Sequence, residues 1–64
     1  MKYPEITAQL TGNDGNAFAI LGTVTKALRR NDVSEEEIID FYNQATAGDY
    51  DHLLQTCMKW VDVQ

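Results

Sequence analysis

Residues 49–57 hold the side chains of this sequence that are best suited to chemistry: two aspartates, the only histidine and the only cysteine. Asp49 and Asp51 beside His52 have the donor types that bind a metal ion or orient an imidazole for acid–base work. Adjacent helical residues point about 100° apart, so Asp51 and His52 diverge, and Asp49 is better placed to cap a helix. The favoured interpretation is a solvated histidine, and a small metal- or ligand-binding protein that uses Asp49–His52 is the alternative.

The nucleophile candidates Cys57 and Ser34 have simpler structural explanations. Cys57 falls on a helical stripe with Leu53, Leu54 and Met58, where a thiol behaves as a small apolar group. A reactive thiolate needs an exposed, electropositive setting and a nearby base. Ser34, the only serine, is taken up by capping a helix, which removes a serine triad. We therefore expect no enzyme activity and no catalytic, cofactor-binding or metal-binding residues.

The turn from Gly12 to Asn16 lies between an expected strand and an expected helix, as phosphate-binding turns do. It lacks the glycine spacing of dinucleotide-binding loops and the Lys-Ser or Lys-Thr pair of P-loops. Its asparagines and aspartate favour turns and helix caps instead. We expect this turn to have a structural role.

Length and charge narrow the possible classes of protein further. Sixty-four residues with one cysteine allow one domain, residues 1–64, without an internal disulfide. Ten acidic residues against five basic ones give a formal charge of −5, which disfavours direct binding of nucleic acid. A lone cysteine and the lack of an apolar run of membrane-spanning length predict a cytoplasmic protein that contacts no membrane.

Two segments near the ends of the sequence alternate apolar and polar residues and predict strands. The first is Glu5–Thr11, and Pro4 is expected just before it because proline cannot donate to a sheet. The second begins at Val61. Trp60 and Val61 would also continue a helix, so strand and helix are both open for this tail, and strand is preferred.

Three amphipathic segments between the strands predict helices. The first runs from Asn16 to Arg30. The second begins at a capping box of Ser34 and Glu37 and ends at Gly48, which is expected in a left-handed C′ position. The third follows Asp49 as its N-cap.

Together these elements predict an α+β fold in the order strand-helix-helix-helix-strand, with the two terminal strands packed against the three helices. Two strands alone make an unstable sheet, so the helices must cover its apolar face. The expected core consists of Ile6, Leu10, Leu21, Val24, Leu28, Ile38, Phe41, Tyr42, Leu53, Leu54, Cys57 and Val61.

Two blocks of the sequence carry a resemblance to a known family. They are residues 10–22, LTGNDGNAFAILG, and residues 48–56, GDYDHLLQT. With them the chain resembles, over nearly its whole length, a family of small uncharacterised proteins that bacteria and their phages encode. The resemblance implies a compact single-domain protein and supplies no activity, partner or site residue.

The absence of site chemistry predicts a small, non-catalytic interaction or regulatory protein, with a phage link implied by the resemblance, that binds another protein. The candidate partner surface combines acidic residues and aromatic rings: Glu35, Glu36, Asp40, Tyr50 and Trp60. Acids between Asp32 and Asp40 also allow an acidic mimic of nucleic acid, although acids in a first helical turn are favourable in any case.

The first strand also predicts a homodimer. If it pairs on one side only, its other edge exposes unpaired backbone groups, and neither lysine nor internal proline discourages a second copy from adding there. The competing expectation is that a loop, or the residues around Tyr3 and Pro4, shield this edge.

Overall fold

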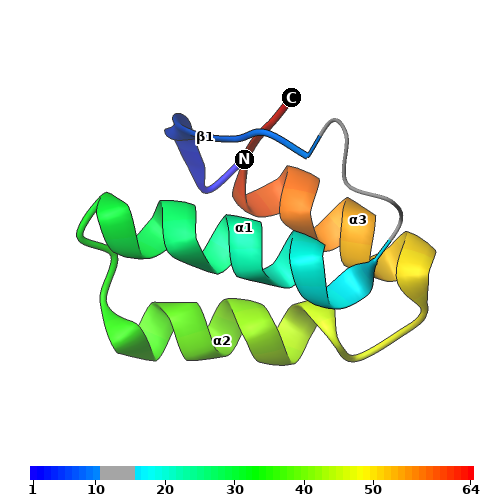
Figure 1. Ribbon diagram of the computed structural model, residues 1–64. Coiled ribbons are helices and arrows are strands. Elements are labelled where there is room, and N and C mark those ends of the chain that lie inside the picture. The colour runs from blue at the N-terminus through cyan, green and yellow to red at the C-terminus, as the bar shows by residue number, and fades with distance from the viewer. Residues whose placement is uncertain (11–15) are drawn as a thin grey trace.

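The computed structural model describes residues 1–10 and 16–64 of the chain. They form, in order, β1 (Tyr3–Ala8), α1 (Ala17–Arg30), α2 (Glu35–Ala45), α3 (Tyr50–Trp60) and β2 (Val61–Val63). The two strands lie over α1 and α3, and α2 packs on the opposite side of these helices (Figure 1). The predicted α+β fold, with the order strand-helix-helix-helix-strand, is confirmed.

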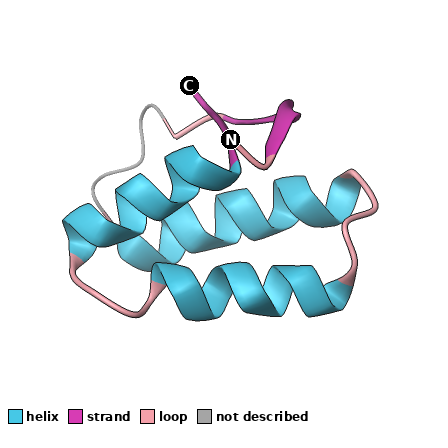
Figure 2. Ribbon diagram, turned by 180° about the vertical axis from the view of Figure 1, so that it is seen from behind, coloured by secondary structure: helices cyan, strands magenta, loops and turns pink. Residues whose placement is uncertain are grey.

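β1 and β2 form a parallel two-stranded sheet, visible on one side of the helices in Figure 2. Tyr3 pairs with Val61 and Ala8 with Val63. Backbone pairing continues past the strands, because Gln64 N–H donates to the Ala8 carbonyl at 2.9 Å and Leu10 N–H donates to the Gln64 carbonyl at 2.7 Å. The tail after α3 is therefore a strand.

The bounds of the first strand differ from the prediction. β1 begins at Tyr3 rather than Glu5, and Pro4 lies inside it. The register is irregular between Tyr3 and Thr7, and a bulge of this kind tolerates a residue that cannot donate to the ladder. The expectation of a strand without internal proline is wrong. Thr11, its predicted last residue, lies outside the described residues, as does most of the predicted turn.

Side-chain caps begin all three helices, as the sequence predicts. Asn16, Ser34 and Asp49 are the N-caps of α1, α2 and α3, and each accepts a hydrogen bond from a backbone N–H of the first turn. These caps satisfy donors that have no partner inside the helix. The Glu37 carboxylate does not complete a capping box: residues of the N-terminal segment bind it instead.

The end of α1 is a Schellman motif that the sequence analysis did not identify. Asn31 is the C-cap, and Asp32 follows with φ of 63°. Val33 N–H donates to the Leu28 carbonyl at 3.1 Å and Asp32 N–H to the Arg29 carbonyl at 3.1 Å, which are the two bonds of this motif. An aspartate therefore occupies a left-handed position that favours glycine.

Gly48 does not have the predicted left-handed conformation. α2 ends at Ala45 with Thr46 as its C-cap, before Gly48 is reached. A Cβ atom on Gly48 would lie 2.8 Å from Cγ of His52, so the glycine allows the histidine ring to approach. The left-handed cap is wrong, and the close approach explains the residue.

Most of the predicted core is buried. Leu10 and Leu54 are half-buried at its margin, and Tyr42 is exposed, so its assignment to the core is wrong. The buried face of α3 carries Leu53, Cys57 and Trp60, whereas Met58 is exposed. Five apolar residues join the core beyond those predicted: Ala8, Ile20, Ala27, Ala45 and Trp60.

Asp32→Gly is expected to stabilise the protein by about 1 kcal/mol, because glycine adopts positive φ without the steric cost of a Cβ. The free energy of unfolding from urea titration measures this gain. Asp32→Ala is the matched control, since it removes the same carboxylate and keeps the Cβ. Equal stabilities of the two variants would contradict the backbone explanation.

Candidate functional site

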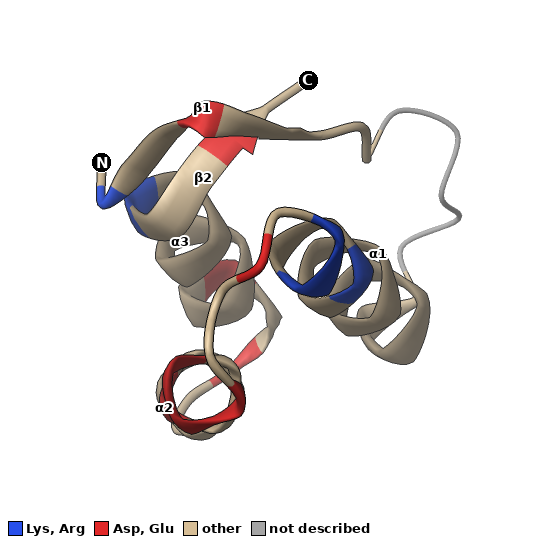
Figure 3. Ribbon diagram, turned by 90° about the vertical axis from the view of Figure 1, so that its left-hand side faces the viewer, with Lys and Arg blue, Asp and Glu red and all other residues tan. Residues whose placement is uncertain are grey.

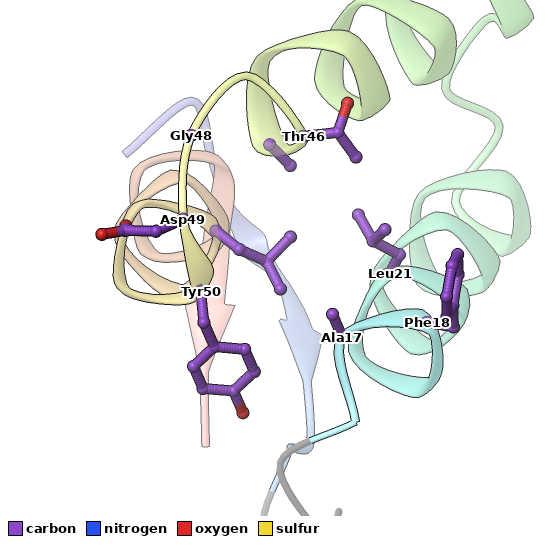
Figure 4. Close-up of a pocket in the computed structure, with 9 residues that line it drawn as sticks. Ala17, Phe18, Leu21, Thr46, Gly48, Asp49 and Tyr50 are labelled. Atoms are coloured by element: carbon purple, nitrogen blue, oxygen red, sulfur yellow. The ribbon is translucent and has the colours of Figure 1, made fainter.

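An apolar hollow of about 230 Å³ lies between the start of α1 and the turn that joins α2 to α3. Its sides come from Ala17 and Phe18 of α1 and from Tyr50 of α3. Leu21 and Leu53, both buried, form its base and connect it to the core. The hollow is therefore an opening onto the apolar interior between two helix N-termini (Figure 4).

Two aromatic rings flank this hollow from opposite sides (Figure 4). Phe18 is 77% exposed and Tyr50 is 41% exposed. The Asn16 cap places Phe18 in the first turn of α1, and the Asp49 cap makes Tyr50 the first residue of α3. Local capping chemistry thus positions both rings at the rim.

Tyr50 was predicted from the sequence as a partner residue, and Phe18 was not. Helical periodicity places Phe18 beside the apolar face, but it does not reveal that no other element of the described ranges covers this side chain. The exposure of the ring is therefore a tertiary property. A large aromatic residue within two positions of an expected N-cap was the available signal.

The acidic part of the predicted partner surface lies elsewhere. Glu35, Glu36 and Asp40 are exposed along the first half of α2, whereas the hollow lies at the C-terminal end of that helix. Figure 3 shows acidic residues around α2 and basic residues on α1. Arg29 Nε donates a hydrogen bond to Glu35 Oε1 at 3.0 Å, and the two side chains form an ion pair. The structure does not gather these acids and Tyr50 into one patch.

Trp60, the remaining predicted surface residue, belongs to the core. It is 4% exposed, and its ring packs edge-on to Phe41 with the centroids 5.5 Å apart. The Tyr3 ring lies 6.1 Å away, and Lys2 Nζ lies 4.3 Å from the indole centroid. Nε1 donates to Gln44 Oε1 at 3.2 Å. The assignment of Trp60 to a partner surface is wrong, because α2 and the N-terminal segment cover it.

Glu37 joins this aromatic cluster to α2. Its carboxylate forms a salt bridge with Lys2 at 2.6 Å and accepts a hydrogen bond from the Tyr3 hydroxyl. The bonds from Lys2 and Tyr3 lower the pKa of Glu37, and the bond to Glu37 raises the pKa of Tyr3. These charges hold the N-terminal segment on the helices and give no sign of a reactive group.

The segment Asp49–His52 also serves the fold. Asp49 Oδ1 accepts the His52 backbone N–H at 2.9 Å, and His52 Nε2 lies 2.9 Å from the Gln44 carbonyl oxygen, to which it donates. Asp51 accepts a bond from Gln55 at 3.1 Å. Within residues 1–10 and 16–64, no three potential metal ligands come together. His52 is thus a bridge from α3 to the end of α2 rather than only a solvated side chain.

Cys57 is fully buried, and burial raises the pKa of its thiol to about 11. The thiol is therefore protonated at neutral pH and shielded from solvent.

Within the described ranges, no helix has the length and apolar character needed to cross a bilayer.

Native Cys57 is expected to react with Ellman's reagent at pH 7.5 only as fast as the protein opens, because its thiol is buried and protonated. The measurement compares labelling rates in buffer and in 6 M guanidinium chloride. Rapid stoichiometric labelling of the native protein, confirmed as folded by circular dichroism, would contradict the core assignment.

Glu37 makes stability sensitive to acid. Its folded pKa is below the ordinary value of 4.5, so its contribution is complete well above that pH and is lost as the pH falls through the folded pKa. Glu37→Gln is therefore expected to flatten the fall in unfolding free energy between about pH 5 and pH 3. Glu36→Gln, on the neighbouring exposed carboxylate, is the control. Parallel acid profiles of wild type and Glu37→Gln would refute the linkage.

Comparison with known proteins adds no relative to this geometry. No family model, curated protein or solved structure matches the chain. The resemblance carried by residues 10–22 and 48–56 therefore stays a prediction. The function is proposed below from the contacts of the chain's own residues.

Proposed function

We propose that this chain is a small, non-catalytic interaction protein that binds another protein through the apolar hollow. The observation that carries the proposal is the 77% exposure of Phe18 directly beside that opening. An exposed aromatic ring next to an apolar recess is the arrangement found where an interface has its strongest contacts. A partner's apolar side chain enters the hollow and packs between Phe18 and Tyr50.

The size of the hollow supports a protein partner over a metabolite. Its volume of about 230 Å³ is below the range of about 300–1,000 Å³ that small-molecule sites occupy. Among the described residues on its wall, Asp49 is the charged one, and its carboxylate already caps α3. One anchoring side chain suits this space, and the Tyr50 hydroxyl gives the rim a polar group that a partner's backbone can bind.

The roles of the remaining polar residues support a function without catalysis. The Cys57 thiol is buried, the Ser34 hydroxyl accepts a helix N–H, and the His52 ring donates to the Gln44 carbonyl. A nucleophile must be paired with a free base and open to substrate. These three side chains already have structural partners or lack access to solvent.

Phe18→Asp is expected to weaken partner binding by at least about tenfold, because it places a charge where the partner buries an apolar group. Immobilised wild-type and variant proteins are incubated with bacterial lysate, and the proteins retained by wild type are quantified on each. One retained protein is then purified and titrated. Stability should change little, because the Phe18 side chain is exposed.

Ile39→Asp is the matched control. Ile39 is 57% exposed on α2, so the substitution introduces the same charge at an exposed apolar position away from the hollow. The purified partner should bind this variant as tightly as wild type. Equal losses with both variants, or undiminished binding to Phe18→Asp, would reject the hollow as the binding site.

A further inference from the structure

A polar groove of about 420 Å³ lies between β1 and the C-terminal half of α1, whereas the apolar hollow lies at the start of that helix. Thr7 and Gln9 line one side of the groove, and Lys26 and Arg30 line the other. The later part of β1 runs along α1 (Figure 1). The groove therefore has a strand on one wall and a basic helix face on the other.

The strand wall is a sheet edge that no strand in residues 1–10 and 16–64 pairs with. Ala8 and Leu10 direct backbone groups to Gln64 on the β2 side. Backbone groups of successive strand residues point to opposite edges, so those of Thr7 and Gln9 point away from β2, on the edge that borders the groove. No backbone hydrogen bond joins Gln9 to any residue in the described ranges. A segment in extended conformation can therefore form backbone hydrogen bonds with Thr7 and Gln9.

The helix wall carries positive charge that the described part of the chain leaves without an ion pair. Salt bridges there join Lys2 to Glu37 and Arg29 to Glu35, and none reaches Lys26 or Arg30. Both side chains are exposed, and Figure 3 shows that α1 carries basic residues. The groove thus offers a ligand two cations, Lys26 and Arg30, on a protein of net charge −5.

The spacing of the two cations matches that of a strand. Residues four apart on a helix are separated by about 6 Å along its axis, and alternate residues of a strand by about 6.8 Å. Consecutive residues on one face of an added strand would therefore reach Lys26 and Arg30 in turn. Carboxylates at positions i and i+2 complement this pair.

We propose that an extended acidic segment of a partner protein adds to the free edge of β1 and directs two alternate carboxylates to Lys26 and Arg30. Backbone bonds to Thr7 and Gln9 supply the pairing, and the carboxylates supply the register. The overall charge of −5 repels an acidic partner only weakly, because charges farther than about 8 Å away are screened at physiological ionic strength.

A second copy of this chain fits the groove less well than such a segment. Its own β1 contains Pro4 and the irregular register, and it offers the single carboxylate of Glu5. The other clustered acids, on α2, are helical and cannot add as a strand. The homodimer predicted from the sequence is accordingly an outcome that the experiment must distinguish.

The probe is a capped peptide of sequence Thr-Val-Glu-Val-Glu-Val-Thr, titrated into ¹⁵N-labelled full chain and followed by amide chemical shifts. The amides of Thr7 and Gln9 are expected to shift most, and added salt should weaken binding. Lys26→Gln with Arg30→Gln should weaken binding roughly tenfold or more. Arg29→Gln with Lys59→Gln, the same change in charge outside the groove, should change it less than about threefold.

Two control peptides separate strand pairing from simple charge attraction. Glutamine in place of both glutamates should weaken binding as much as the Lys26 and Arg30 variant does. Methylation of alternate backbone nitrogens keeps the charge and removes the pairing, so it should abolish the shifts at Thr7 and Gln9. Unchanged binding of the methylated peptide, or shifts centred elsewhere, would overturn the proposal.

If the amide chemical shifts of Thr7 and Gln9 change with protein concentration in the absence of peptide, a second copy of this chain binds the edge. That result would also overturn the proposal. Lack of binding at millimolar peptide would reject the groove as a site for this class of segment. The Phe18→Asp experiment tests binding at the apolar hollow. Its result therefore does not depend on the outcome of the peptide titration.

Discussion

The indole of Trp60 is the contact on which the arrangement of this small protein most depends. It is the last residue of α3, and it directly precedes β2. Phe41 of α2, Tyr3 of β1 and the ammonium of Lys2 all meet this one side chain. Such a ring buries more area than any aliphatic residue, and each aromatic pair adds about 0.5–1.5 kcal/mol beyond that burial. Four segments of the chain are thereby fixed around one group.

The same arrangement explains why two surfaces of α1 stay available. The Trp60 cluster fixes β1, α2 and α3 to one another, and α1 completes the core with Ile20, Val24 and Leu28. In its first turn, Phe18 is exposed beside the hollow. Farther along, the polar side of the helix faces the edge of β1. One helix thus separates an apolar recess from a charged groove, and their chemistries suit different contacts.

Local patterns predicted the elements of this fold well, because capping and periodicity depend on residues close in sequence. Asn16, Ser34 and Asp49 were each recognisable as helix starts, and the alternation after Trp60 favoured the strand that is found. The conformation of Asp32 was not predictable in this way, since a left-handed aspartate resembles any polar residue between helices.

The candidate sites were less accessible from sequence, because exposure depends on which elements meet. Trp60 and Tyr50 lie at the two ends of one helix, and both were predicted to belong to a partner surface. The N-terminal segment covers Trp60, whereas Tyr50 lies at the rim of the apolar hollow. Tyr42 lies on an apolar stripe and is exposed, because the buried side of α2 narrows to Ile38, Phe41 and Ala45. The groove depends on β1 lying against α1, which no local pattern specifies.

The parallel pairing of β1 with β2 has a consequence for how the chain reaches this structure. The three helices form from neighbouring residues, whereas the sheet joins segments from opposite ends of the sequence. Closing so long a loop costs entropy before the strands gain their hydrogen bonds. The helices should therefore be largely formed in the folding transition state while the sheet is not. The edge of β1 then reaches its final geometry only as the last part of the molecule to become ordered.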